Sequence, residues 1–235
     1  MTGSMTDPAT PPFVLLVVAK APVPGLAKTR LCPPATPPQA AEIAAAALLD
    51  TLDAVCAVPG AMPVVAMTGD LGAAARTAEI SMALRRVTAI PQRGWDFGAR
   101  LANAHADAAA VHAGLPSLQI GMDTPQVTPA SLAAAAAPIR HGGRDSVLGP
   151  AADGGWWALG LAEPRHAQVL AGVPMSRDDT GVRTWRALTS CGLRPGKAAL
   201  LSDVDTMADA RAVAAACPDG RFARAVAAVG RRAAA

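Results

Sequence analysis

Aromatic residues and lysines are scarce in this chain. Its 235 residues include three phenylalanines, four tryptophans and no tyrosine, although 51% are hydrophobic, so small aliphatic side chains must fill the interior. Lysine supplies only three of the 21 positively charged side chains. The net charge is +3 and no long basic run is present. This argues against nucleic acid binding, because a duplex binder concentrates lysine and arginine on one face.

Further absences limit the location of the protein and the kind of site it carries. No apolar run reaches the roughly 18 residues that a membrane span needs. The polar start of the chain lacks the charged and apolar regions of a signal peptide. The cysteines are far apart and include no C-x-x-C pair, which predicts reduced thiols in a cytoplasmic protein, not a disulfide framework or zinc site. They are Cys32, Cys56, Cys191 and Cys217.

Short apolar runs alternate with alanine-rich segments along the chain. Residues 13–19 are almost continuously apolar, which is typical of a strand covered on both faces. The alternation predicts an α/β protein with a mostly parallel sheet, organised as one domain over residues 13–230 behind a disordered tail of residues 1–12. Further strands are expected at residues 62–67, 86–90, 117–121, 146–149, 157–161 and 198–202, and helices at residues 36–55, 71–79, 97–114, 128–138, 180–189 and from 207.

The loop after the first strand, AKAPVPGLAKTRL, holds two of the three lysines. Lys20, Lys28 and Arg30 can converge on a polyanion, and Gly25 lets the backbone approach it closely. The loop contains neither the Walker pattern nor the dinucleotide fingerprint. We predict that it binds phosphate. The alternative is a solvated loop whose cations aid solubility.

Aspartates follow two other predicted strands. Asp123, in GMDTP, is well placed to hold a magnesium ion that bridges phosphates. The alternative for Asp123 is a turn residue before Pro125 that bonds its own backbone. In SDVDT, Asp203 and Asp205 alternate at a strand end, so we expect at most one of them to face the same metal.

The segment PAADGGWW combines a tight turn with adjacent tryptophans. Gly154 and Gly155 after Asp153 allow close approach of a ligand. Trp156 and Trp157 should point to opposite faces of a strand. A hairpin turn closed by an aromatic plug is the alternative.

The segment QRGWDFGARL could add Arg93 and Arg100 to the site. Its alternative interpretation is a helix start with Asp96 near the N-cap. The histidines show no site spacing, and no G-x-S-x-G elbow for a serine nucleophile is present.

Together these motifs resemble those of the DUF2064 family. AKAPVPGLAKTRL, GMDTP, LGPAADGGWWALGL and LSDVDTMADA occur in the order of that family. The family is similar to nucleotide-diphospho-sugar transferases and is related to 2-phospho-L-lactate guanylyltransferases and molybdenum-cofactor nucleotidyltransferases. The resemblance implies a three-layer α/β/α, Rossmann-like fold of the glycosyltransferase A type.

The resemblance also implies roles for individual residues. Lys20, Lys28 and Arg30 would hold nucleotide phosphates, with Lys28 acting in catalysis. Asp123 would match the metal-binding aspartate after the central strand, and Asp205 the second metal aspartate, with Mg²⁺ or Mn²⁺ as the ion.

The acceptor side would be formed by the turn of Asp153, Gly154 and Gly155, with Asp153 as a further catalytic residue. The chain departs from related patterns at three points: its first loop has fewer glycines than in pyrophosphorylases, GMDTP holds one aspartate in place of D-x-D, and DGGWW has tryptophan where the family often has tyrosine.

The expected function is metal-dependent nucleotidyl transfer from a nucleoside triphosphate to a small phosphorylated acceptor. One alternative is glycosyl transfer from a nucleotide-sugar, with Asp153 as the base. A second alternative is a nucleotide-binding protein without catalysis.

Overall fold

The computed structural model describes residues 10–230. Most of the predicted tail and the last five residues therefore lie outside the described part of the chain. Residues 10–12 are described, and the carbonyl oxygen of Pro11 accepts a hydrogen bond from Nε of Arg140 at 2.9 Å.

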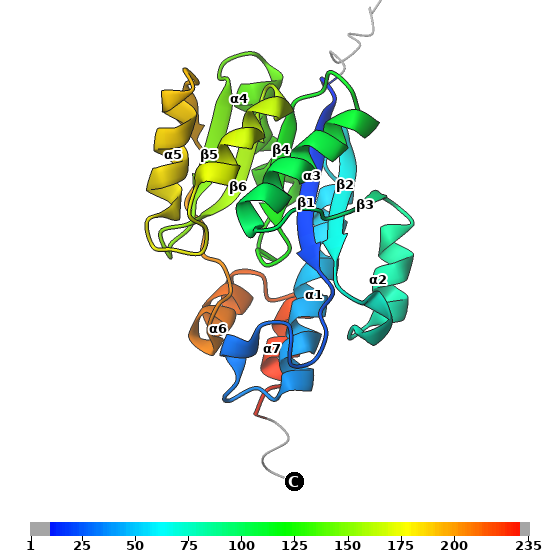
Figure 1. The fold of residues 1–235 in the computed structure, drawn as a ribbon. Coiled ribbons are helices and arrows are strands. Elements are labelled where there is room, and N and C mark those ends of the chain that lie inside the picture. Colours follow the sequence, from blue (N-terminus) through cyan, green and yellow to red (C-terminus); the bar gives the residue numbers. More distant parts are fainter. Residues whose placement is uncertain (1–9, 231–235) are drawn as a thin grey trace, which may run out of the picture.

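A seven-stranded sheet forms the centre of the molecule, in the order β3-β2-β1-β4-β6-β5-β7. Strand β6 is antiparallel to its neighbours β4 and β5, and the remaining pairs are parallel. The predicted α/β fold with a mostly parallel sheet is confirmed (Figure 1). The strands are β1 (Phe13–Lys20), β2 (Ala61–Thr68), β3 (Thr88–Pro91), β4 (Ser117–Gly121), β5 (Ser146–Pro150), β6 (Trp156–Leu161) and β7 (Pro195–Lys197).

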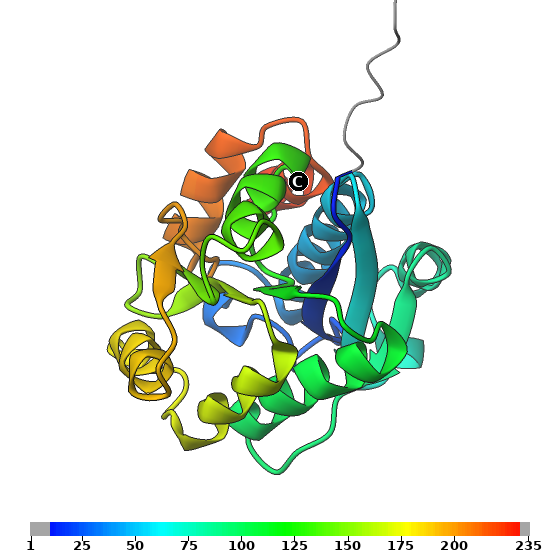
Figure 2. The same cartoon turned by 90° about the horizontal axis from the view of Figure 1, so that it is seen from above.

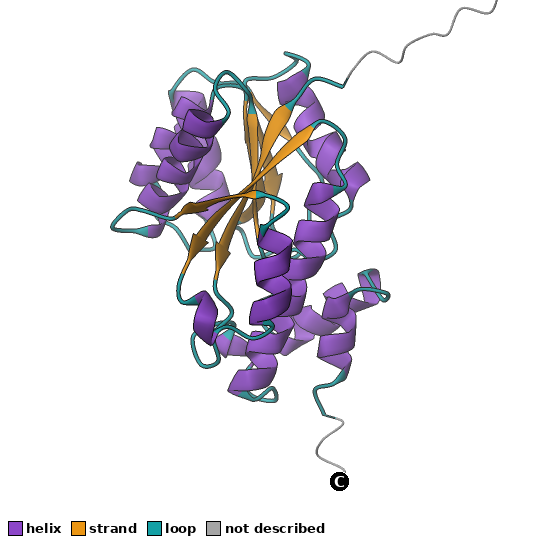
Figure 3. Cartoon of the chain, turned by 90° about the vertical axis from the view of Figure 1, so that its right-hand side faces the viewer, coloured by secondary structure: helices purple, strands orange, loops and turns teal. Residues whose placement is uncertain are grey.

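Helices cover both faces of the sheet, which gives three layers (Figures 2 and 3). Strand β1 is apolar on both sides because Leu15 and Val17 pack into one core and Leu16 and Val18 into the other. The first core includes α1 (Pro37–Cys56), α2 (Thr77–Leu84) and α4 (Pro129–Arg140), and the second includes α3 (Phe97–Val111), α5 (Thr180–Ser190) and the 3₁₀ helix η3 (Pro164–Gly172).

Three helices begin at capping boxes, in which the side chains of the first and fourth residues bond each other's backbone N–H, and at α4 these residues are Thr128 and Ser131. At α1 these are Thr36 and Gln39. Thr206 and Asp209 form the same motif at α6 (Met207–Ala216). Because Thr206 fixes where α6 starts, it also fixes where the preceding acidic segment ends.

Two predicted elements differ from the structure. Residues 71–79 are not one helix, because the 3₁₀ helix η2 (Leu71–Ala73) ends before α2 begins at Thr77. The last strand is not residues 198–202 but the shorter β7, and Leu201 forms only an isolated bridge with Ala151. The Trp157 indole donates to the carbonyl of Ala199 at 2.8 Å, so a side chain takes the bond that a strand neighbour would take.

A third core joins the C-terminal helices to the first loop. It contains Leu31 from the 3₁₀ helix η1 (Thr29–Leu31), Ile43 from α1, Val204, and Phe222 from α7 (Arg221–Ala227). Val204 is only 1% exposed and lies between the two aspartates of SDVDT. Burial of this residue therefore places the acidic segment beside the cationic loop.

Candidate active site

A cavity of about 720 Å³ opens at the carboxyl ends of β1 and β4. This is where ligands bind in open α/β sheets. The cavity brings together residues from the four motifs predicted to form one site, although they are separated by up to 185 positions in the sequence. Of the predicted site residues, those that line it are Lys20, Lys28, Arg30, Asp123, Asp153, Gly155 and Asp205.

Lys28 is the cation placed deepest among these carboxylates. Its Nζ donates to Oδ2 of Asp123 at 2.8 Å and to the carbonyl of Val204, and lies 3.8 Å from Oδ1 of Asp205. Its side chain is 15% exposed. Burial alone would lower the pKa of Lys28, but the three neighbouring aspartates raise it above its ordinary value. Lys28 is therefore held in its charged form.

The other two cations of the loop are more exposed. Arg30 forms an ion pair with Asp205 at 2.9 Å, with 76% of its own side chain exposed. Nζ of Lys20 donates to the carbonyl of Leu26 at 3.1 Å, which spans the loop. Gly25 has φ 77° and does not line the cavity, so its role in the described chain is to turn the loop.

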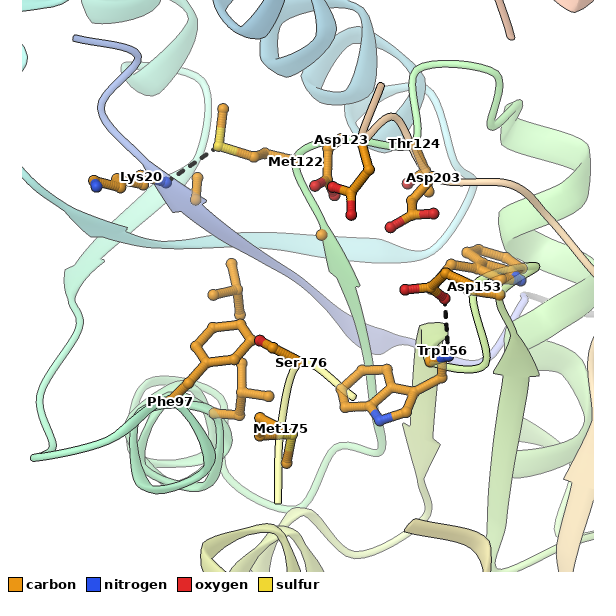
Figure 4. A pocket seen from close by; sticks show the side chains of 18 of the residues that line it. Lys20, Phe97, Met122, Asp123, Thr124, Asp153, Trp156, Met175, Ser176 and Asp203 are labelled. Atoms are coloured by element: carbon orange, nitrogen blue, oxygen red, sulfur yellow. Dashed lines mark hydrogen bonds between the residues drawn. The ribbon is translucent and has the colours of Figure 1, made fainter. Parts of the chain in front are cut away.

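Both aspartates of SDVDT line the cavity. Residues 202–205 form no regular strand, so the alternation from which we expected at most one of them to face the metal is absent. How many of them face a metal stays a prediction. Asp203 points into the space shared with Asp123 and Asp153 (Figure 4). Burial, followed by the charges of Asp153, Asp205 and Asp123, raises the pKa of Asp203 to about 6.

The turn of residues 151–155 connects β5 to the antiparallel β6, as the hairpin alternative expected. Oδ1 of Asp153 accepts the N–H of Gly155 at 2.8 Å, which fixes the carboxylate at the cavity wall. Gly154 does not line this cavity, and a Cβ atom there would lie 1.8 Å from the carbonyl oxygen of Asp178. Close backbone packing is therefore one reason for a glycine at this position, and its role on the acceptor side stays a prediction.

The two tryptophans point to opposite faces, as predicted. Trp156 packs against the core on one face, and its indole donates to Oγ1 of Thr184 at 3.1 Å. Trp157 belongs to the core on the other face. Both tryptophans line the cavity, and Figure 4 shows Trp156 at its apolar wall together with Phe97 and Met175.

Several cavity residues were not among the residues that the sequence predicted for the site. Nε2 of Gln92 donates to the carbonyls of Ala19 and Ala66 at 2.8 and 2.9 Å, which joins the loop after β3 to the sheet. Phe97 and Met175 come from segments predicted only as a helix start and a loop. Phe97 is an exposed apolar residue at the start of a helix and Met175 is a partly buried apolar residue in a loop, and such residues are too common to identify a site.

The two candidate arginines of QRGWDFGARL differ in whether they line the cavity. Arg100 lines the cavity and stacks 5.6 Å from the ring centre of Phe97. Arg93 pairs with Asp107 of α3 at 2.5 Å and does not line the cavity. Asp96 caps α3 through Ala99 N–H at 2.7 Å, so the helix-start interpretation of this segment is also correct.

The donor set fits a hard divalent ion. Carboxylate oxygens from Asp123, Asp203 and Asp205 reach the cavity from two loops, and such ligands suit Mg²⁺ and Mn²⁺. Within the part of the chain that the structure describes, Oγ1 of the adjacent Thr124 is buried without a hydrogen-bond partner. Within residues 10–230 no three acidic, histidine or cysteine side chains are arranged to hold a metal by themselves. Mg²⁺ commonly takes one or two carboxylates and completes its shell with substrate phosphates and water.

None of the helices in residues 10–230 is long and apolar enough to cross a membrane.

Comparison with solved structures shows the fold. A Desulfovibrio desulfuricans G20 protein, named as a candidate nucleotide-diphospho-sugar transferase, is 24% identical, with a TM-score of 0.76 over 91% of this chain and 92% of that chain. CMP:2-keto-3-deoxy-manno-octonic acid synthetase in complex with CTP is 12% identical, with a TM-score of 0.55 over 88% and 98%. 4-Diphosphocytidyl-2C-methyl-D-erythritol synthase from Anaerococcus prevotii is 9% identical, with a TM-score of 0.55 over 88% and 96%.

A family model identifies the family of this chain, whereas a search of curated protein sequences finds no match. The model of DUF2064, described as an uncharacterized protein conserved in bacteria, matches residues 51–177. This is more than half of the chain and includes GMDTP and the DGGWW turn. The chain therefore belongs to the DUF2064 family, as its motifs predicted.

Proposed function

We propose that this protein transfers a nucleotidyl group from a nucleoside triphosphate to a small phosphorylated acceptor, with Mg²⁺ or Mn²⁺. One observation carries the proposal: the cationic loop after β1 and the aspartates after β4 and β7 meet in one cavity at the carboxyl ends of the strands. Cations and a carboxylate-bound metal are what phosphoryl chemistry requires. The shared fold with a CTP-bound synthetase supports a nucleotide donor.

The chemistry needs no nucleophile from the protein. An anionic oxygen of the acceptor phosphate attacks the α-phosphorus, the bond from that phosphorus to the β-phosphate oxygen breaks, and pyrophosphate leaves with its electron pair. Lys20 and Arg30 border the cavity with exposed cationic groups that can neutralise the phosphates. A bound divalent ion would supply further positive charge at the phosphates, held by Asp123 and Asp203 or Asp205.

Glycosyl transfer from a nucleotide-sugar is the second candidate. Asp153 favours it, because this carboxylate lines the cavity opposite the first loop and could accept a proton from an acceptor hydroxyl. A third possibility, from another class, is nucleotide binding without turnover.

The products distinguish these candidates. The protein would be incubated with each ribonucleoside triphosphate, Mg²⁺ and pools of small phosphorylated compounds, and separately with nucleotide-sugars and sugar or alcohol acceptors. Our proposal expects acceptor-dependent release of pyrophosphate. Release of a nucleoside diphosphate from a nucleotide-sugar would support the second candidate and contradict the first. Saturable nucleotide binding with no product in either assay would support the third.

A further inference from the structure

Lys28 occupies a position that has the chemistry of a metal site. Its ammonium group contacts a carboxylate oxygen of Asp123 and the backbone carbonyl of Val204, and lies near a carboxylate oxygen of Asp205. All three are hard oxygen donors, of the kind that Mg²⁺ and Ca²⁺ prefer. They come from two loops that are held together by the third core. The singly charged ammonium group of Lys28 therefore neutralises the carboxylates that would bind a divalent ion.

The backbone shows that this placement is built into the loop. Lys28 has φ 47° and ψ 42°, in the left-handed region that non-glycine residues rarely enter. The following residues, from Thr29 to Leu31, form η1, and Leu31 is fully buried. An exposed lysine could reach a partner with ordinary dihedral angles. The strained backbone and the burial of Leu31 instead direct Lys28 inward.

The loop has a second lysine that shows a different arrangement. The ammonium of Lys20 lies on the carbonyl of Leu26, and within residues 10–230 it forms no ion pair with a carboxylate. Of the lysines in this chain, only Lys28 contacts the acidic segment. The contact is therefore specific to its position and is not a general result of placing lysines near aspartates.

A divalent ion cannot share this position with the ammonium group. A magnesium ion binds oxygen at about 2.0–2.1 Å, and Nζ of Lys28 is already 2.8 Å from Oδ2 of Asp123. Both cations on this oxygen would lie within a few ångströms of each other, where like charges repel strongly in a partly buried site. Asp203 and Asp153 have no ion-pair partner within residues 10–230, and the ion pairs of Asp123 and Asp205 in this part of the chain are with Lys28 and Arg30.

We propose that Lys28 is an internal cation that holds the metal position in the nucleotide-free protein and leaves it when a triphosphate enters. The phosphate oxygens then accept the N–H bonds of Lys28, and the freed oxygens of Asp123 accept the metal, so that nucleotide and metal bind together. The transfer of Lys28 onto the phosphates of a triphosphate rests on the proposed function. The competition between Lys28 and a metal does not depend on that function, and it can be measured with the metal alone.

The buried hydroxyl of Thr124 supports a ligand at this place. Thr124 is 1% exposed, lines the cavity next to Asp123, and its Oγ1 has no hydrogen-bond partner within the described chain. A buried hydroxyl without a partner is costly. A metal-bound water or a phosphate oxygen at the position vacated by Lys28 would satisfy it.

The first experiment measures Mn²⁺ binding to the nucleotide-free protein by the loss of the free-ion paramagnetic resonance signal. Lys28→Met removes the internal cation and keeps an unbranched side chain of nearly the same length. Lys197→Met is the matched control, because Lys197 lies on Trp185, 5.7 Å from its ring centre, away from the carboxylates. We expect weak binding to wild type and to Lys197→Met, and at least tenfold tighter binding to Lys28→Met. Equal affinity in all three proteins would overturn the proposal.

A charge-preserving variant separates the role of charge from any change of structure. Lys28→Arg should keep the weak Mn²⁺ binding of wild type, since a guanidinium also neutralises Asp123. Tight binding to Lys28→Arg would contradict competition by charge. Thermal unfolding without ligand shows that each variant is folded before its affinity is compared.

The second experiment measures binding of a nucleoside triphosphate in the presence of EDTA. If Lys28 moves onto the phosphates, Lys28→Met should bind the metal-free nucleotide at least tenfold more weakly than Lys197→Met. Equal affinity would overturn the displacement step. If Lys28→Met gains Mn²⁺ affinity while no triphosphate binds any variant, the result supports Lys28 as the cation in the metal position and contradicts the proposed function.

Discussion

At the scale of single residues, the site is governed by what surrounds each charged group. Asp205 pairs with an exposed arginine, whereas Asp203, two positions earlier, has no ion-pair partner among the described residues and has a raised pKa. Asp153 is fixed by the backbone of its own turn. The residue types were visible in the sequence, but the different environments of these aspartates arise only from the fold.

Gly154 provides a prediction about stability. It has φ 88°, and the Cβ atom of an alanine would lie 1.8 Å from the carbonyl oxygen of Asp178. Gly154→Ala combines backbone strain with a backbone clash, so we expect a loss of about 3 kcal/mol or more in the free energy of unfolding. Gly142→Ala is the control, because Gly142 has φ 70° with open space around it and should lose about 1 kcal/mol.

Chemical denaturation of both variants tests this packing explanation. Equal losses in Gly154→Ala and Gly142→Ala would mean that the turn moves away from Asp178 without cost. In that case Gly154 would again be open to a role in ligand approach.

His105 makes stability depend on pH. Burial lowers its pKa to about 4, although the nearby Gln119 side chain opposes the shift. Its Nδ1 lies 2.8 Å from Oγ of Ser117. The unfolded chain, with a histidine pKa near 6.5, binds this proton more readily. The effect of His105 on the free energy of unfolding is therefore absent above about pH 6.5, and this free energy falls as the pH decreases toward 4.

The variant His105→Asn removes the titration and keeps a polar group near Ser117. Between pH 7.5 and pH 5, we expect wild type to lose about 2 kcal/mol more unfolding free energy than the variant. Urea denaturation at the two pH values gives this difference. A loss of the same size in both proteins would show that His105 does not titrate differently in the folded and unfolded states.

At the scale of elements, the C-terminal helices decide where the acidic segment lies. Helix α7 has only seven residues, and its N-cap, Gly220, provides no side chain. Asp50 of α1 takes that role: it accepts the backbone N–H of Phe222 at 2.8 Å and Nη1 of Arg221 at 3.0 Å. A carboxylate at a helix N-terminus is favourable. One helix therefore caps another across the third core.

Asp50→Ala should loosen this contact. The side chain of Asp50 is only 11% exposed, so its removal leaves a buried N–H and part of a guanidinium without their partner, and we expect a loss of about 2–3 kcal/mol. Asp219→Ala, at an exposed position before α7, should change stability by less than about 0.5 kcal/mol.

Hydrogen exchange locates the effect of Asp50→Ala. Faster exchange should be concentrated in α7 and α6, with the sheet unchanged. Uniform acceleration throughout the protein would contradict a local capping role and indicate that α7 unfolds only with the whole molecule.

At the scale of the whole molecule, the fold could be predicted better than the site. Continuous apolar runs such as residues 13–19, and their alternation with helical segments, are local signals that determine the layers. The meeting of four loops followed from the rule for carboxyl ends of strands. The contact between Lys28 and Asp123 spans 95 positions and has no local signal.

Errors in the prediction arose where a tertiary contact replaced a regular element. Residues 198–202 look like a strand, but the indole of Trp157 and the bridge at Leu201 take their backbone groups. Because residues 202–205 do not form a strand, the rule that Asp203 and Asp205 point to opposite sides does not apply. The apolar wall at Phe97 and Met175 depends on how α3 packs against η3, where Gly98 would place a Cβ atom 2.3 Å from the carbonyl of Leu170.

The central claim is that this cavity binds a nucleotide together with a metal through Asp123. The most direct measurement is the affinity of each ribonucleoside triphosphate, by calorimetry, with Mg²⁺ and with EDTA, for wild type, Asp123→Asn and the exposed control Asp219→Asn. The amide preserves the shape of the carboxylate but removes its charge. We predict that Mg²⁺ tightens nucleotide binding at least tenfold in wild type and Asp219→Asn and fails to do so in folded Asp123→Asn. The same gain from Mg²⁺ in Asp123→Asn, or no nucleotide binding to wild type, would contradict the account.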